Sequence, residues 1–319
     1  MDKSLKQEQL KELVSITAER LNIKYPSIIE KDYHVTSIIH SLAHIENEYF
    51  RLIFAGGTCL AKAHRIVKRM SEDIDFKIVF KNNGVLFTRS RLLKELKKFR
   101  SQIMFSLALP DLTISDIVVR NEGQYLRAEL TYPALFTGND SLRPHLLLEF
   151  TLSNIRLTTE DLTINTIIED VIEMDTLFSP STISCISADE TAIEKWVGLT
   201  RRIAAIERKY HYDDPTLVRH IYDLNAIKQA DRIGDTFFTL AKAIINYDAK
   251  QFKNKHPEYF GNPSTEIQHS LKALKNNVIW KDRYKKFIDS MVYDKTKLPD
   301  YEDALLMVES ISERIIATI

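Results

Sequence analysis

The hydrophobic and polar residues of this chain follow two different periods, and the pattern changes near residue 188. Before that point, segments with an apolar residue every three or four positions are mixed with segments in which every second residue is apolar; these are the periods of a helix and of a strand. After it, only the helical period recurs. The pattern therefore predicts an α+β fold, with a mixed-sheet core and an N-terminal helical pair in residues 1–188 and an α-helical domain in residues 189–319.

The first part begins with two expected helices separated by Pro26. Its predicted helices are 3–22, 28–46, 58–70 and 90–107. Its predicted strands are 51–55, 71–80, 112–120, 124–132 and 144–153, with two more at 163–175 and 181–187. In the second part the predicted helices are 189–209, 215–229, 232–249, 264–275, 279–291 and 300–317.

Composition narrows the class of protein without assigning a function. The chain has 319 residues, 44% of them hydrophobic and 28% charged, which is typical of a globular protein of one or two domains. Its 44 basic and 44 acidic side chains cancel, so any contact with nucleic acid must use a local basic patch. No apolar run approaches the roughly 20 residues that span a bilayer, and the N-terminus has no signal-peptide pattern. We therefore expect a cytoplasmic protein with no membrane partner.

Cysteine and histidine offer little chemistry in this sequence. Cys59 and Cys185 each lie in an apolar context, and we expect both to be small buried residues rather than a disulfide. His40 and His44 are four residues apart and could share a helix face. Because the sequence places no third ligand near them, a zinc site is not expected.

A glycine pair marks the first candidate site. Gly56 and Gly57 follow a short apolar strand, and Thr58 opens the next predicted helix. Adjacent glycines at a strand end suit unusual backbone angles or the close approach of a phosphate. Thr58 could donate its hydroxyl to a phosphate oxygen or serve as a helix N-cap. For a glycine pair taken alone, a strand–helix turn that binds nothing is the more common explanation.

Two aspartates in the next predicted strand form the second candidate. Asp73 and Asp75 are two residues apart, so both side chains point to one face of the strand, and Ser71 shares that face. Like charges on one face repel unless a cation compensates them. Carboxylate oxygens favour Mg²⁺ or Mn²⁺ over zinc. The alternative is a strand edge that simply faces solvent.

Glu149 is a single acid within the apolar strand 144–153. A buried acid needs a partner, and this one is a natural third carboxylate for a site that holds two metal ions. A salt bridge at the strand end is the alternative.

Cations early in the helical part could bind phosphate groups. Lys195 and Arg202 are seven residues apart and share a helix side, with Arg201 close to it. Such cations can clamp a triphosphate, although an ordinary charged helix face gives the same pattern. The predicted helix 90–107 is also basic. It could contact an RNA backbone, extended by Lys62, His64, Arg65, Lys68 and Arg69, or be a solvated face.

Taken together, these motifs resemble the AbiEii/AbiGii-type nucleotidyltransferase toxins, a family within the DNA polymerase β-like nucleotidyltransferase superfamily. The resemblance runs over residues 29–225. Its motifs are E-K-D-Y in residues 29–36, G-G-T-x-L-x-K-A in 54–63, R-x-S-E-D-I-D in 69–76, and Lys195 with Arg201, Arg202 and the R-H-I-Y-D-L run in 219–224. His220 stands where the family often has aspartate, whereas Asp223 keeps the second acid.

The resemblance implies a nucleotidyltransferase-like sheet core and a reaction. Asp73, Asp75 and Glu149 would hold Mg²⁺ or Mn²⁺, and Gly56, Gly57, Thr58 and Ser71 would bind the phosphates of an NTP. Lys195, with Arg202, would neutralise the leaving pyrophosphate, and Asp223 would orient Lys195 or a substrate hydroxyl. A nucleoside monophosphate would pass to RNA, often the 3′ end of tRNA. The family also implies a cognate antitoxin and a place in a toxin–antitoxin or phage-defence (abortive infection) system.

Three other functions stay open at this stage. The same site could transfer AMP or UMP to a protein hydroxyl, or the fold could survive as a non-catalytic nucleotide-binding protein. A phosphotransferase that moves only the terminal phosphoryl group would release a nucleoside diphosphate in place of pyrophosphate. The sequence does not give the preferred nucleotide, the antitoxin, the oligomeric state or the role of residues 226–319.

Overall fold

The chain divides into two compact units in the computed structural model, which describes residues 5–82, 87–137, 142–173, 177–178, 182–294, 296 and 298–319. The first unit, here the sheet unit, comprises Met1–Arg65 and Met70–Ser187. The second, the helical unit, comprises Ala188–Ile319 together with Ile66–Arg69. Four residues of the first half thus belong by their contacts to the second unit, which the linear pattern did not suggest.

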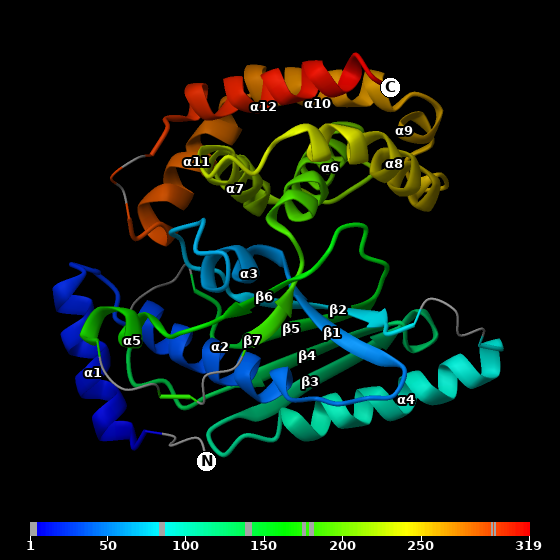
Figure 1. Ribbon diagram of the computed structural model, residues 1–319. Helices are drawn as coiled ribbons and strands as arrows, with labels where there is room; N and C mark the ends of the chain where they lie inside the picture. The colour runs from blue at the N-terminus through cyan, green and yellow to red at the C-terminus, as the bar shows by residue number, and fades with distance from the viewer. Residues whose placement is uncertain are drawn as a thin grey trace. The chain divides into compact units, whose positions relative to one another are not determined.

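The sheet unit is built on seven strands in the order β3-β4-β5-β2-β1-β7-β6 (Figure 1). The strands are β1 Phe50–Ala55, β2 Asp73–Phe80, β3 Thr113–Arg120, β4 Tyr125–Thr131, β5 Leu146–Leu152, β6 Glu160–Thr163 and β7 Thr182–Cys185. β2 runs parallel to β5 and β1 runs parallel to β7, whereas the other neighbours are antiparallel. The sheet is therefore mixed, as the α+β prediction required.

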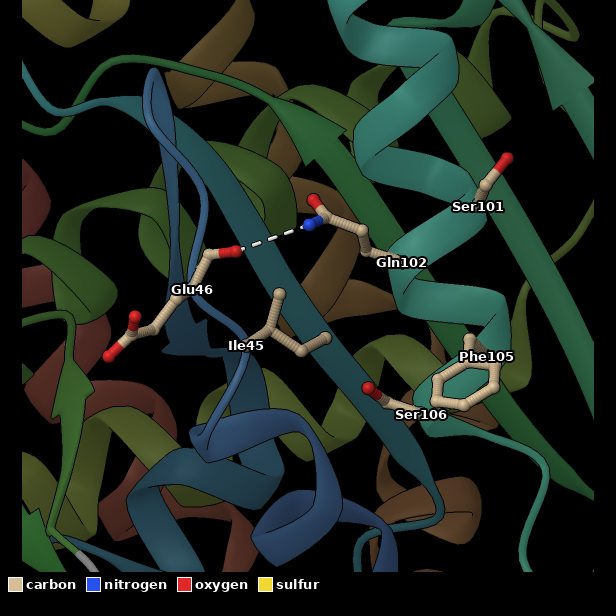
Figure 2. A pocket seen from close by; sticks show the side chains of 6 residues that line it. All are labelled: Ile45, Glu46, Ser101, Gln102, Phe105 and Ser106. Carbon is tan, nitrogen blue, oxygen red and sulfur yellow. Dashed lines mark hydrogen bonds between the residues drawn. The ribbon is translucent and has the colours of Figure 1, made fainter.

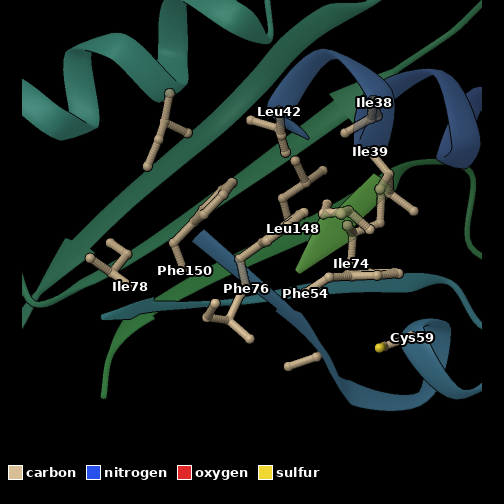
Figure 3. Close-up of a cluster of buried hydrophobic side chains, with 14 of the residues drawn as sticks. Ile38, Ile39, Leu42, Phe54, Cys59, Ile74, Phe76, Ile78, Leu148 and Phe150 are labelled. Atoms are coloured by element: carbon tan, nitrogen blue, oxygen red, sulfur yellow. The ribbon is translucent and has the colours of Figure 1, made fainter. Parts of the chain in front are cut away.

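One face of this sheet is buried beneath helices α2 (Ser27–Ala43) and α4 (Arg89–Ser106) (Figure 1). Alternate residues of β2 reach this face, and Ile74, Phe76 and Ile78 are all at most 2% exposed. The ring of Phe76 lies 5.6 Å from that of Phe150 on β5 and 5.3 Å from that of Phe54 on β1 (Figure 3). These cross-strand aromatic contacts fix which face of β2 turns inward.

Shorter helices complete the sheet unit. α1 (Gln7–Arg20) and α5 (Ile167–Ile172) pack with α2 around a second apolar cluster that includes Leu10, Val14, Ile29 and Ile168. Helix α3 (Gly56–Lys62) follows β1 directly, and the 3₁₀ turn η1 (Asn121–Gly123) joins β3 to β4. Cys59 and Cys185 are free, buried thiols, as expected.

The regular elements of the helical unit are helices in the part of it that the structure describes, apart from an isolated β-bridge between Arg69 and Val292. The helices are α6 Ala188–Glu207, η2 Pro215–Leu217, α7 Val218–Gln229, α8 Asp235–Phe252, α9 Pro257–Gly261, α10 Pro263–Asn276, α11 Val278–Met291 and α12 Tyr301–Ile316. The indole of Trp196, fully buried on α6, donates to the hydroxyl of Ser312 on α12 at 2.9 Å. A buried indole thereby packs its rings and satisfies its one donor.

The predicted fold class is confirmed, but three elements differ from their predictions. The helix expected over 58–70 ends at Lys62, because Arg65 takes a φ of +56° and the chain then passes to the helical unit. The strand expected over 163–175 is β6 followed by α5, whose capping box Thr166/Glu169 was a readable helix signal. Helix α9 was not predicted, since its five residues are too few for a period. None of the helices in the described parts of the chain is long and apolar enough to cross a bilayer.

Candidate functional site

Asp73, Asp75 and Glu149 lie on one face of the sheet, opposite the face that α2 and α4 cover; we call these three residues the acid face. Along β2 the buried and half-buried residues alternate, so both aspartates share the half-buried side. The parallel register pairs Asp75 directly with Glu149. Side chains of registered neighbours point the same way and stand about 5 Å apart. Because β2 pairs with β5, the Glu149 side chain lies beside the two aspartates, as expected from its place in an apolar strand.

Gly56 makes room for Asp75. The first residue of α3 has a φ of +75°, and a Cβ built there would stand 2.0 Å from Oδ2 of Asp75. Register explains the contact, because Ala55 at the end of β1 pairs with Asp75 on β2. The glycine is thus required both by its backbone angle and by the carboxylate against it.

Thr58 serves the aspartates rather than capping the helix. Ala55 is the N-cap of α3, so the N-cap alternative for Thr58 is wrong. The Thr58 hydroxyl, in a side chain that is 1% exposed, donates to the backbone carbonyl of Asp73. It therefore holds the first residue of β2 in place. Ser71 lies two residues before that strand.

Each of two acids already has a partner. Arg143 Nη1 donates to Oδ1 of Asp73, and the side chains of this pair are 36% and 34% exposed. The hydroxyl of Tyr125, on β4, donates to Oε1 of Glu149. Burial and the neighbouring Glu149 carboxylate raise the pKa of Tyr125 well above its ordinary value, so the tyrosine stays a donor.

The ligand atoms of the acid face are of the chemical type that a divalent cation prefers. It offers hard carboxylate oxygens on two adjacent strands, and the Asp75 carboxylate occupies the position that a Cβ of residue 56 would take. As they are placed here, no three acidic, histidine or cysteine side chains of the described residues converge closely enough to hold a metal ion. Binding would therefore need Asp73 and Glu149 to turn from Arg143 and Tyr125.

The first turns of α2 carry three buried charges that the sequence named only as part of a motif. Glu30 accepts the backbone N–H groups of Leu135 and Phe136 at 2.6 and 3.1 Å. Asp32 accepts from Lys62 at 2.6 Å and from the backbone N–H of Ile167 at 2.7 Å. These two acids hold a loop and the start of α5, so they have structural roles.

Lys31, between them, belongs to the surroundings of the acid face. Its ammonium is completely buried and donates at 2.6 Å to Glu72, the residue before Asp73. It also donates at 2.7 Å to the backbone carbonyl of Arg143. Arg143 was not among the site residues predicted from the sequence. The one available signal was an arginine followed by Pro144 immediately before an apolar strand, which is weak.

A second charged cluster lies within the helical unit. Asp223 on α7 is completely buried and accepts from Arg69 Nε and Nη2, each at 2.7 Å. Lys195 on α6 lies 2.7 Å from Oδ2 of the same carboxylate, the oxygen that Arg69 Nη2 also contacts. Burial opposes the ionised form, but Arg69 and Lys195 hold the pKa of Asp223 well below its usual range. The expected pairing of Asp223 with Lys195 is therefore present.

His220 and Arg202 complete this cluster. Burial and the charges of Lys195, Arg202 and Arg69 lower the pKa of His220 to about 3, so the ring is neutral near pH 7. Its Nδ1 is buried and has no hydrogen-bond partner among the described residues. Arg202 forms an ion pair with Asp214 and remains 31% exposed.

The basic patch expected to extend the 90–107 helix is only partly present, because Arg65 and Lys68 are exposed whereas Lys62 and Arg69 are not. Lys62 is buried against Asp32 and Arg69 is buried against Asp223, while the His64 ring contacts the carbonyl of Ile186 at 2.8 Å. The predicted patch assumed one continuous helix over 58–70, which would have aligned these side chains. Helix α4 itself exposes Lys94 and Lys97 but covers the sheet face opposite the acids.

A surface pocket of about 370 Å³ lies beside the C-terminal half of α4 (Figure 2). It is lined by Ile45, Glu46, Ser101, Gln102, Phe105 and Ser106. Gln102 donates to the backbone carbonyl of Glu46 at 3.3 Å, which closes one side. None of the predicted site residues lines it, so the pocket is separate from the acid face.

Comparison with known proteins supplies one strong match. A family model described as nucleotidyl transferase AbiEii toxin, type IV TA system, matches residues 43–306. A comparison with curated protein sequences gives no match. The chain is similar to the structure of the nucleotidyltransferase toxin MenT4 of Mycobacterium tuberculosis H37Rv, with 13% identity and a TM-score of 0.41. That similarity covers 96% of this chain and 98% of the other. The chain is also similar to the structure of a candidate nucleotidyltransferase from H. pylori, with 13% identity and a TM-score of 0.38. That similarity covers 90% of this chain and 96% of the other. The family match covers most of the chain, whereas both structural likenesses are too weak to carry an argument.

Proposed function

The chain belongs to the AbiEii family of nucleotidyltransferase toxins from type IV toxin–antitoxin systems, and from this we propose that it transfers a nucleoside monophosphate from an NTP to RNA, with release of pyrophosphate. The proposed acceptor is the 3′ end of tRNA, and the proposed cofactor is Mg²⁺ or Mn²⁺. The family also implies an antitoxin as partner.

The observation that supports this proposal most is the acid face. Asp73 and Asp75 share one side of β2, and the register of β5 sets Glu149 beside Asp75. Three carboxylates this close destabilise the fold unless a cation compensates them. Arg143 compensates Asp73 in the free protein, and a bound divalent cation would compensate the acids and also bind a polyanionic triphosphate.

Each residue of the acid face and its surroundings would have its own role in the reaction. Asp73, Asp75 and Glu149 would hold the metal, which when bound lowers the pKa of an acceptor hydroxyl and offsets phosphate charge. Gly56 allows Asp75 to lie against the start of α3, and Thr58 fixes the backbone of Asp73. Tyr125, whose proton stays on its oxygen, orients Glu149.

The charged cluster of the helical unit would supply cations for phosphate. Lys195 forms an ion pair with Asp223, and Arg69 shares the same carboxylate. We propose that Lys195 neutralises the charge that builds on pyrophosphate as it leaves, with Asp223 as its positioning residue. Arg202 is half-exposed beside Asp214 and is proposed as the weaker second cation.

The test incubates purified protein with each labelled NTP, Mg²⁺ and total cellular RNA, and repeats the reaction with Asp73→Ala. Label in tRNA that is absent with Asp73→Ala supports the proposal. The matched control is Asp170→Ala on α5, an aspartate whose side chain is 43% exposed and outside the acid face. That variant should keep full incorporation.

Other outcomes separate the remaining functions. Label in protein would favour transfer to a protein hydroxyl, and nucleoside diphosphate in place of pyrophosphate would favour phosphoryl transfer. No incorporation with any of the NTPs would contradict both transfer functions. Expression should arrest growth, and Asp75→Ala should relieve the arrest if transfer causes it.

A further inference from the structure

The backbone N–H and carbonyl of Arg143 are both held by a buried ion pair. Glu72 Oε1 accepts the backbone N–H of Arg143 at 2.6 Å, and Lys31 Nζ donates to the backbone carbonyl of the same residue at 2.7 Å. Lys31 and Glu72 also contact each other at 2.6 Å. All three contacts close one small ring of charge-assisted hydrogen bonds around a single residue.

Burying the Lys31–Glu72 ion pair costs free energy, which indicates that the pair has a role other than stabilising the fold. Lys31 is 0% and Glu72 2% exposed, and burying such a pair rarely stabilises a fold more than apolar side chains would. Burial lowers the pKa of Lys31, and Glu72 acts in the opposite direction to keep it charged. Pro144 adds a local restraint, because the residue before a proline is confined to extended backbone. Two independent devices thus fix Arg143.

The topology explains where that fixed residue points. β2 and β5 are parallel with Asp73 opposite Leu147, so the segment leading into β5 runs beside the segment leading into β2. Arg143 precedes β5 and its guanidinium binds Asp73. Burial opposes its charge, but Asp73, Glu72 and Glu149 raise the pKa of Arg143 above its ordinary value. Its side chain is still 36% exposed.

We propose that Arg143 is a further substrate-site residue, placed by Lys31 and Glu72, which occupies Asp73 in the free protein and passes to the triphosphate of the incoming NTP. This rests on the proposed function. Without cofactor, the guanidinium compensates the charge of the acid face. When Asp73 is taken by the divalent cation, the freed planar fork can bind two phosphate oxygens at once.

The proposal requires Arg143 and the cation to compete for Asp73, which can be measured without catalysis. Mn²⁺ binding to the full-length protein, followed by the paramagnetic resonance of free Mn²⁺ in the absence of nucleotide, is the readout. Arg143→Gln should bind Mn²⁺ about fivefold more tightly than the wild type, since it loses a competing ion pair. The same variant should have a KM for NTP raised about tenfold or more, since it loses a charged hydrogen bond to phosphate.

Two further variants sharpen the test. Arg143→Lys keeps the charge but not the fork, so its Mn²⁺ affinity should stay near the wild-type value while its KM for NTP still rises. Arg89→Gln removes an exposed arginine that pairs with Glu122 and not with any residue of the acid face, and should change neither quantity. Equal Mn²⁺ affinity in wild type and Arg143→Gln would overturn the proposal.

Failure of the proposed function gives a different result. If Asp73→Asn binds Mn²⁺ as tightly as the wild type, the acid face is not the metal site and the function proposed for it falls. If Asp73→Asn loses Mn²⁺ while Arg143→Gln behaves as wild type, the metal site stands and only the role of Arg143 falls.

Discussion

Asp75 lies so close to Gly56 that a methyl group at position 56 would stand 2.0 Å from its Oδ2 atom. The contact joins the end of β1 to the middle of the acid face, because Ala55 and Asp75 are register partners. A glycine that could have been a simple turn residue is therefore part of the environment of a proposed metal ligand.

Gly56→Ala should consequently impair both fold and function. A non-glycine residue at a φ of +75° costs about 1–3 kcal/mol of stability, and the added carbon must displace the Asp75 carboxylate. Displacement of about 1 Å should lower the rate of nucleotide transfer about 100-fold. Urea unfolding and initial transfer rates measure the two effects.

Gly198→Ala is the matched control for this glycine. It lies within α6, and a Cβ there would meet nothing within 4 Å. Alanine should therefore stabilise the helix by about 0.5–1 kcal/mol and leave transfer unchanged. Full activity in Gly56→Ala would show that the position of Asp75 does not matter for the reaction.

Asp223→Asn should be strongly destabilising. The variant leaves the buried charges of Arg69 and Lys195 without a counter-ion, which typically costs about 3–5 kcal/mol. The free energy of unfolding from urea titration measures this. Lys281→Gln, which removes an exposed pair with Glu302, should change it by less than about 1 kcal/mol. A similar small change in Asp223→Asn would contradict the assigned pairing.

Stability should fall in mild acid through His34. Its side chain is 6% exposed against the ring of Tyr132, and burial lowers its pKa from 6.5 to about 4. Between these values the unfolded chain binds a proton that the folded chain does not, so stability is lost as pH falls from about 6.5 to 4, by about 3 kcal/mol.

His34→Phe keeps a ring at this position and removes the proton site. Its free energy of unfolding, measured by urea titration between pH 7 and pH 4.5, should therefore depend less on pH than that of the wild type. Parallel pH dependences in the two proteins would show that His34 does not titrate as its burial indicates.

Charge reversal on α4 should leave transfer nearly unchanged. Lys94 and Lys97 are exposed, but their helix covers the sheet face opposite Asp73 and Asp75. Lys94→Glu/Lys97→Glu should keep the KM for RNA within about twofold at physiological salt, because charges beyond about 8 Å are largely screened. A large, salt-dependent rise in KM would instead restore the hypothesis that this helix binds RNA.

The positions of the acids could be predicted from the sequence because the signal is local. Alternation along residues 71–80 determines that Asp73 and Asp75 share one side of a strand, whatever the rest of the fold does. Residue patterns over 29–225 likewise identified the family that the match to residues 43–306 now shows. Where the period was too short to read, as in α5 and α9, the prediction was wrong or absent.

Only the tertiary structure decided which charged side chains form ion pairs with residues far away in the sequence. Lys62 and Arg69 looked like neighbours in an exposed basic patch, yet their partners Asp32 and Asp223 lie 30 and 154 residues away. Arg143 reaches Asp73 because two strands that are far apart in sequence run parallel. A local period fixes which way a side chain points, whereas strand order and register, set by packing of the whole core, fix what it meets.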